Sequence, residues 1–321
     1  MIQRLHHARL RVADLAEAKA RWSLLYGLSD ASDALGAGER DDRALLRCGY
    51  EDFCLELVAA DDAPPGVEYA AYELRSGIGL AEAAERVAEA VGDHPREVEV
   101  PVRGAALATA DPDGNRVVLL ERALPEDRTP PVSRYTDVLP GFRPRRLQHV
   151  NYLTTDVPRL ADFYERALGL GISDWVGDGA VWMHCDRDHH VAAFLDKGYA
   201  HIHHIAFELV DWGEMRVFCD HLGQHRRPIT WGPGRHTMAQ NLFAYCRMTE
   251  EDLFVELFCD MEQLERDHEP RVFADDPHGA NAWGSLPPRT YFRFDAAAIA
   301  AEREQREMLQ GLADIGPDPG A

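Results

Sequence analysis

A short strand-like run that opens with histidine and is followed by aspartate recurs along the chain. The copies read His7-Ala-Arg-Leu-Arg-Val-Ala-Asp14, His149-Val-Asn-Tyr-Leu-Thr-Thr-Asp156 and His204-Ile-Ala-Phe-Glu-Leu-Val-Asp211, with the aspartate seven residues after the histidine each time. Gly27 lies as far beyond the first histidine as Gly169 lies beyond the second. Duplication of one structural unit is the simplest account of this register.

The hydrophobic spacing around these runs predicts an alternation of strands and helices. In the first half we expect strand 5–12, helix 15–25 ending at Gly27, strand 69–74, helix 81–91 and a turn at 111–114 leading into strand 115–121. In the second half we expect strand 147–154, helix 158–168, strands near 179–185 and 190–195, strand 203–210, helix 213–222 and a hairpin of 241–248 with 253–259.

These elements predict an α+β fold of four βαβββ units in two tandem modules, with a tail helix at the C-terminus. We expect an N-terminal module over 1–124, a linker over 125–146, a catalytic module over 147–270 and a tail over 271–321. Five prolines favour a non-helical linker. Helices should cover one face of each sheet and leave the other to curl around a site. The tail should end in helix 296–309 and dock without a catalytic role.

Composition narrows the functional classes. The chain has 321 residues and a formal net charge of −21, which disfavours nucleic acid and anionic membrane surfaces as partners. It contains neither a run of about 20 apolar residues nor an N-terminal signal-peptide pattern. The six cysteines are scattered without CxxC pairs, which is typical of reduced thiols in a cytoplasmic protein.

The second module contains a complete ligand set for a divalent metal. His149, His204 and Glu256 fall on predicted strands, and two imidazoles with one carboxylate form the facial triad that leaves metal positions open. A lone histidine of this kind is more often a core or surface residue. The first module offers His7, Tyr69 and Val118 in the same register, so two of three ligands are absent and we interpret the first module's histidine as vestigial.

The chain resembles the vicinal oxygen chelate superfamily, and within it the two-domain type I extradiol catechol dioxygenases, over nearly all of residues 1–290. The motifs are Leu147-Gln-His149-Val-Asn151-Tyr, Asp188-His189-His190-Val-Ala-Ala-Phe194, His203-His204-Ile-Ala-Phe207, Gly232-Pro-Gly-Arg-His236 and Phe254-Val-Glu256-Leu. Around Asn151, Trp182 and the Gly-Pro-Gly-Arg-His segment the chain looks most similar to homoprotocatechuate dioxygenases.

The resemblance implies roles for further residues. His190, rather than His189, corresponds to the acid–base histidine because Phe194 follows four residues later. His236 corresponds to a histidine that hydrogen-bonds the substrate, and Tyr245 to a tyrosine beside the substrate oxygens.

The sequence leaves open the alignment of Tyr245 and the roles of Asn151 and Trp182. Eleven residues separate Tyr245 from Glu256 where the family usually has ten, and the intervening turn at 249–252 is unusual, so a longer turn or a bulge is needed. Asn151 and Trp182 would line the substrate and oxygen pocket, although simple packing explains either residue equally well.

The implied activity is extradiol cleavage of a substituted catechol, with both atoms of O2 entering a muconic semialdehyde-type product. The implied cofactor is Fe(II), with Mn(II) equally compatible with the ligands, and the implied assembly is a homo-oligomer, either a dimer or a tetramer. Homoprotocatechuate enzymes place an arginine five residues before the His236 position. Here Trp231 takes its place, which favours an apolar or aromatic substituent, while Arg235 and Arg289 could recruit an anionic group from another direction.

Two other functions share the expected fold. A glyoxalase-like isomerase would use a more carboxylate-rich ligand set, often assembled across two modules. A metal-free small-molecule binding protein would have no reason to keep two histidines and a glutamate in register.

Overall fold

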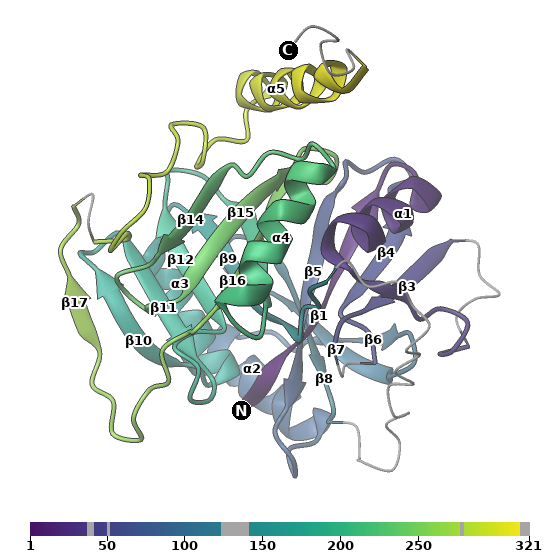
Figure 1. Cartoon of the computed structure of the whole chain (residues 1–321). Helices are drawn as coiled ribbons and strands as arrows, with labels where there is room; N and C mark the ends of the chain where they lie inside the picture. The colour runs from purple at the N-terminus through teal and green to yellow at the C-terminus, as the bar shows by residue number, and fades with distance from the viewer. Residues whose placement is uncertain (37–41, 50–51, 123–140, 277–278, 315–321) are drawn as a thin grey trace, which may run out of the picture.

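The computed structural model describes residues 1–36, 42–49, 52–122, 141–276 and 279–314 (Figure 1). Most of the predicted linker, residues 125–140, lies outside this part of the chain. Residues 141–145 form neither helix nor strand, and the next strand begins at Arg146. None of the described helices is long and apolar enough to cross a membrane.

The four predicted βαβββ units are present. The first module comprises β1 (Ile2–Val12), α1 (Leu15–Tyr26), β2 (Ser29–Asp30), β3 (Arg43–Arg47) and β4 (Leu55–Ala59), then β5 (Gly66–Leu74), α2 (Leu80–Val91), β6 (Arg96–Val100), β7 (Gly104–Ala110) and β8 (Arg116–Leu120). These strands form one sheet in the order β2-β3-β4-β1-β5-β8-β7-β6. The two units therefore meet where β1 pairs antiparallel with β5.

The second module repeats this arrangement. It comprises β9 (Arg146–Thr154), α3 (Val157–Phe163), η2 (Tyr164–Leu168), β10 (Gly171–Val176), β11 (Ala180–His184) and β12 (Ala192–Asp196), then β13 (His201–Glu208), α4 (Trp212–Gln224), β14 (Trp231–Arg235), β15 (Leu242–Met248) and β16 (Leu253–Cys259). The tail adds β17 (Arg271–Phe273) and α5 (Ala296–Asp314). The sheet order is β14-β15-β16-β13-β9-β12-β11-β10-β17.

The recurring aspartates are helix N-caps. Asp14, Asp156 and Asp211 accept backbone N–H groups at the starts of α1, α3 and α4, over 2.8, 3.1 and 3.1 Å. Each side chain satisfies one of the donors that a helix leaves unpaired at its N-terminus. Gly79 precedes α2 without a side-chain cap. The second unit along the chain therefore keeps the fold without the aspartate cap.

One predicted helix differs in detail. Helix 158–168 is α-helical only to Phe163 and continues as a π-helical turn that ends at Gly169, whose φ is 71°. The buried positions Val157, Leu160, Ala161, Tyr164 and Leu168 keep the spacing of an α-helix across the π-helical turn. The spacing of apolar residues therefore does not distinguish the two forms.

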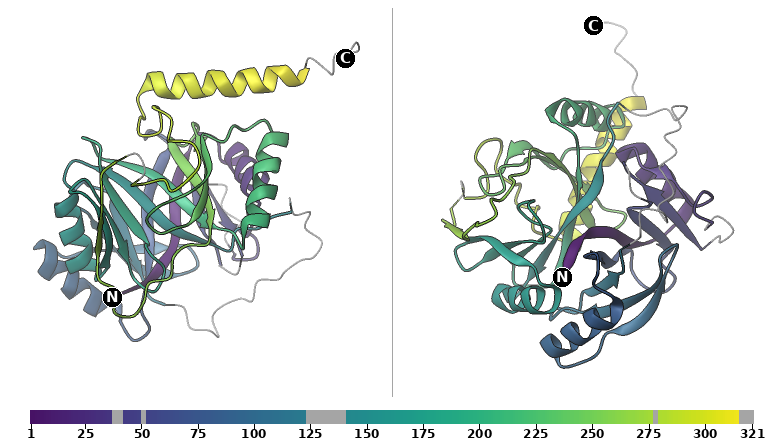
Figure 2. Two further views of the ribbon diagram at one scale, coloured as in Figure 1. Left: turned by 60° about the vertical axis from the view of Figure 1, so that its left-hand side comes forward. Right: turned by 90° about the horizontal axis from the view of Figure 1, so that it is seen from below.

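Helices α1–α4 cover one face of each sheet, and the modules pack with these faces toward a shared core (Figures 1 and 2). The Tyr72 and Tyr152 hydroxyls meet across the modules at 3.4 Å, and Arg86 of α2 donates to the Arg166 carbonyl over 3.0 Å. The opposite face of each sheet has a separate apolar cluster, which includes Phe53 in the first module and Tyr245 in the second. Each sheet thus retains a face of its own for a site.

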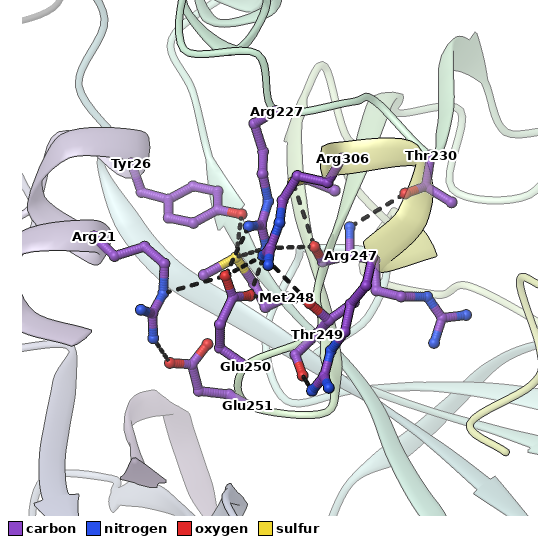
Figure 3. Close-up of polar contacts among 12 residues, drawn as sticks. Arg21, Tyr26, Arg227, Thr230, Arg247, Met248, Thr249, Glu250, Glu251 and Arg306 are labelled. Atoms are coloured by element: carbon purple, nitrogen blue, oxygen red, sulfur yellow. Dashed lines mark hydrogen bonds and ion pairs between the residues drawn. The ribbon is translucent and has the colours of Figure 1, made fainter. Parts of the chain in front are cut away.

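A cluster of arginines and glutamates fixes the turn between β15 and β16 to α1 and α5 (Figure 3). Glu250 accepts from Arg227 over 2.9 and 2.8 Å, and also from Arg306 of α5. Glu251 is fully buried and pairs with Arg21 of α1. Buried carboxylates are tolerated when they are paired in this way. The turn therefore joins both modules and the tail helix.

Replacing Glu250 with glutamine should destabilise the fold in a pH-dependent way. Burial raises the pKa of this carboxyl, but the arginines, led by Arg227, outweigh burial and lower the pKa to about 2. The stabilisation is complete above the unfolded-state pKa and is lost as the pH falls through about 2. Glu250→Gln should therefore lose about 2 kcal/mol at pH 7 and progressively less toward pH 2, as measured by urea unfolding. Exposed Glu89→Gln is the control, and an equal loss at all pH values would contradict the ion-pair explanation.

Candidate metal centre

The three predicted ligands lie side by side on the face of the second sheet that carries no helices. His149 on β9 is paired with Ala206 on β13, and Ala206 is paired in turn with Glu256 on β16. His204 stands two residues before Ala206 on β13. The Glu256 Oε2 atom lies 3.0 Å from His149 Nε2 and 3.3 Å from His204 Nε2, and the two Nε2 atoms are 3.4 Å apart.

The ring proton of His149 is placed by its neighbour in sequence. The Gln148 side-chain amide nitrogen donates to the His190 carbonyl over 2.7 Å, which turns the amide oxygen toward His149 Nδ1 at 2.7 Å. An amide oxygen only accepts, so Nδ1 carries the proton. The Nε2 atom of His149 therefore presents a lone pair to the centre.

The neighbouring His203 fixes the position of the ring proton of His204. His203 Nε2 lies 2.9 Å from the Tyr291 carbonyl oxygen, which only accepts, so Nε2 carries the His203 proton. Burial lowers the pKa of His203 well below its usual value and keeps the ring neutral. Its Nδ1 atom must then accept from His204 Nδ1 over 2.8 Å. His204 Nε2, like that of His149, is left as an acceptor.

Three acceptors consequently converge without a proton between them. Of the three, Glu256 presents its Oε2 atom to both Nε2 atoms. The other oxygen, Oε1, accepts from Asn241 Nδ2 over 3.0 Å. Donors bound at right angles to one ion at about 2.1 Å lie about 3.0 Å apart. The donor set and its spacing thus fit one divalent cation held by His149, His204 and Glu256.

A cavity opens over this centre, and all nine candidate site residues line it. Its lining residues are His149, Asn151, Trp182, His190, Leu195, His203, His204, Trp231, His236, Met238, Ala239, Asn241, Tyr245, Glu256, Ala280, Tyr291 and Phe292. Among these, Ala280, Tyr291 and Phe292 come from the tail. The sequence does not reveal this contribution because the segment has no regular periodicity.

The predicted acid–base and hydrogen-bonding residues lie beside the ligands. The His190 ring is 4.3 Å from that of His149 between centroids. Burial, followed by the neighbouring histidines, lowers the pKa of His190 well below its usual value, so the ring is neutral. His236 Nδ1 donates to the Ala280 carbonyl over 2.8 Å, so its Nε2 accepts from the Tyr245 hydroxyl over 3.0 Å.

The placement of Tyr245 follows from strand register. It lies directly opposite Glu256, and the pairing runs without a bulge from Leu242 to Met248. The four residues 249–252 form the turn. A longer turn therefore accommodates the unusual spacing.

The outer part of the cavity is aromatic. The Trp231 ring is nearly parallel to Tyr245, with centroids 5.3 Å apart and planes at 12°, and its Nε1 donates to the Ser285 carbonyl over 2.6 Å. The buried Oδ1 atom of Asn151 has no hydrogen-bond partner in the described part of the chain. The lining residues include no lysine or arginine. Arg235 instead donates to the Gln240 carbonyl over 2.6 Å, and Arg289 is exposed.

The first module holds its histidine in the opposite tautomer. Arg103 can only donate, so His6 Nε2 accepts from it over 2.9 Å and His6 Nδ1 donates to His7 Nδ1 over 2.8 Å. His7 must then carry its proton on Nε2, which points to the Tyr69 hydroxyl at 3.3 Å. Val118 occupies the position of the glutamate. The position of the ring proton, together with the missing ligands, supports a vestigial role for His7.

The second module is also similar in sequence to known proteins. Residues 146–254 match the model of the Glyoxalase/Bleomycin resistance protein/Dioxygenase superfamily. A curated relative, "Metapyrocatechase 2" of Cupriavidus necator, is 32% identical over 151 residues, covering 42% of this chain and 47% of the relative. The chain thus spans about half the length of the curated relative it matches.

Solved structures extend the likeness to both modules. A variant of homoprotocatechuate 2,3-dioxygenase from Brevibacterium fuscum has a TM-score of 0.78 at 22% identity and covers 91% of this chain and 81% of its own. The Mn(II)-bound glyoxalase from Novosphingobium aromaticivorans has a TM-score of 0.74 at 22% identity and covers 90% and 93%. At this level of identity they establish the fold alone, which is the predicted two-module arrangement.

Removing either a histidine or the carboxylate of the triad should abolish metal binding. His149→Ala and Glu256→Ala should each bind less than about a tenth of one Fe(II) per chain after anaerobic reconstitution, because two donors rarely hold the ion. Elemental analysis of desalted protein measures this. His7→Ala, at the equivalent position of the first module, should keep the full metal content; a loss there, or retention in the triad variants, would contradict the assignment.

Proposed function

We propose that the chain is a non-haem Fe(II)-dependent extradiol dioxygenase, which uses both atoms of O2 to cleave a substituted catechol to a muconic semialdehyde-type product. The observation that carries the proposal is the convergence of three metal-facing acceptors in one module, with the neutral His190 beside them. The likeness to a metapyrocatechase supports the reaction class. Mn(II) suits the same donors and is the alternative metal.

The residues of the cavity can perform the required proton chemistry. The bound ion would supply a Lewis acid with open positions for a catechol and dioxygen. His190 is neutral and lies against His149, where it can take the proton of a substrate hydroxyl. His236 and Tyr245 would hydrogen-bond the substrate oxygens. Asn151 and Trp182 would border the oxygen and ring positions.

The substrate that fits this cavity has an uncharged substituent. Trp231 presents an indole at the outer wall, and the tail adds Tyr291 and Phe292. A carboxylate would be desolvated there without a cationic partner from the lining residues, which is unfavourable. An alkyl or aryl group would instead bury apolar surface against the aromatic rings.

A glyoxalase-like isomerase is the second candidate, because a Mn(II)-bound glyoxalase shares the fold. The ligand set argues against it: the triad has one carboxylate, lies within one module, and is accompanied by His190 and His236. A metal-free binding protein would not retain three converging acceptors.

We further propose a cytoplasmic homo-oligomer, a dimer or a tetramer, with neither nucleic acid nor membrane as a partner.

Oxygen uptake would test the function directly. After anaerobic reconstitution with Fe(II), the protein should consume O2 with 4-alkyl- and aryl-catechols and form yellow products. Carboxylate-bearing catechols should show at least about tenfold lower kcat/KM, because the cavity supplies no cation. No uptake with any catechol despite bound metal would favour the isomerase, and no metal at all would favour the binding protein.

Replacing His190 should separate catalysis from metal binding. His190→Ala removes the proton acceptor but none of the three ligands, so metal content should be unchanged while kcat falls about 100-fold or more. The exposed His225→Ala is the control and should match the wild type. An unchanged rate in His190→Ala would transfer the acid–base role to another residue.

A further inference from the structure

A chain of buried polar groups leads away from His190, on the side opposite the cavity. His190 Nδ1 lies 3.1 Å from His189 Nδ1, and His189 Nε2 lies 2.8 Å from Asp174 Oδ2 on β10. His189 and Asp174 are fully buried. Neither residue lines the cavity, and the chemistry proposed above uses neither of them.

Asp174 is the fixed end of this chain. Burial raises the pKa of its carboxyl, but hydrogen bonds from His189 and Arg271 outweigh burial and bring the pKa to about 2. Arg271 donates to Oδ1 from its backbone N–H and its Nε, over 3.0 and 2.9 Å, and to Oδ2 from Nη2 over 2.7 Å. The carboxylate can only accept, so His189 Nε2 carries a proton.

We propose that Asp174 and His189 are positioning residues that hold His190 in the tautomer with its proton on Nδ1 and its Nε2 lone pair toward the cavity. In the proposed arrangement His189 carries a single proton, on Nε2, and accepts at Nδ1 from His190 Nδ1–H. When His190 takes the substrate proton at Nε2, its Nδ1 proton stays in place. The Asp174 carboxylate, one ring further away, then stabilises the resulting imidazolium.

A second histidine pair in the same protein supports the proposed direction of the hydrogen bonds. The metal ligand His204 has the same kind of partner, His203, but that pair ends at the neutral carbonyl of Tyr291. Of these two pairs, the one that includes the proposed base ends at a carboxylate. A neutral acceptor suffices to fix a ligand, whereas a residue that gains a proton benefits from a negative charge.

The same groups could be taken for a second metal site, because Asp174, His189 and Glu262 offer closely spaced ligand atoms. Arg271 already supplies the positive charge between the two carboxylates, with Nη2 at 2.7 Å from Asp174 Oδ2 and 2.7 Å from Glu262 Oε2. The grouping is therefore an arginine-bridged acid pair that supports the histidine.

Asp174→Asn tests the proposal, because an amide at this position can reverse the direction of the hydrogen bonds that link it through His189 to His190. The Asn nitrogen is least unfavourable at the Oδ2 position, since Oδ1 receives two donors from Arg271. From there it would donate to His189 Nε2, and His189 Nδ1–H would donate to His190. We expect [15N]histidine spectra of the metal-free protein to show the His190 proton moving from Nδ1 to Nε2. The His190 resonances are assigned with His190→Ala.

The kinetic effect should accompany this change. Asp174→Asn should keep its full metal content and nearly its KM, while kcat falls about 10- to 100-fold. Glu262→Gln is the matched control. It removes the second carboxylate that pairs with Arg271 but leaves the hydrogen bonds from Asp174 through His189 to His190 intact. This variant should keep the wild-type tautomer and rate. An Asp174→Asn protein with the wild-type His190 tautomer would overturn the proposal, and so would an equal loss of rate in Glu262→Gln.

His189→Leu provides an independent test should the aspartate variant fail to fold. It removes the acceptor for His190 Nδ1–H, so the single His190 tautomer should be replaced by a mixture, with a similar loss of kcat and no loss of metal. A rate equal to wild type, or an unchanged single tautomer, would overturn the proposal. The kinetic readout rests on the proposed function, whereas the spectra require no turnover, so the two failures are distinguishable.

Discussion

The direction of a few buried hydrogen bonds determines what this molecule can bind. Each ligand imidazole donates its Nδ1 proton to an acceptor behind it, so that its Nε2 lone pair faces Glu256. Unprotonated nitrogens and a carboxylate at 3.0–3.4 Å repel one another unless a cation lies between them. Strand pairing in the second sheet brings the three ligands together. Gln148 and His203 then orient the two imidazoles so that their Nε2 lone pairs face the metal position.

Much of the fold was accessible from the sequence because its signals are local. The aspartate after each histidine is a helix cap, and Gly27 and Gly169 end helices in the left-handed conformation. The three ligands were accessible because duplication offered a second copy for comparison. Tyr291 and Phe292 could not be predicted from the sequence, because they reach the cavity from an irregular tail whose path depends on tertiary contacts rather than on periodicity.

The tail also has a structural part in the site. Its strand β17 extends the second sheet beside β10, and Arg271 on that strand pairs with Asp174. Further along, the Tyr291 carbonyl receives the His203 proton. The arginines of α1 and α5 meet at the β15–β16 turn, which lies at the end of the strand that bears Glu256 (Figure 3). Segments far apart in sequence therefore fix the geometry of one centre.

The reversed histidine pair of the first module determines what it would take to rebuild a metal site there. Introducing a histidine at Tyr69 or a glutamate at Val118 would still leave His7 with its proton on Nε2 while Arg103 donates to His6. Neither substitution alone gives His7 an Nε2 lone pair that faces the other two positions. Restoring a metal site in the first module would therefore also require removal of the hydrogen bond from Arg103 to His6, so that the imidazole of His7 could exchange its ring proton from Nε2 to Nδ1.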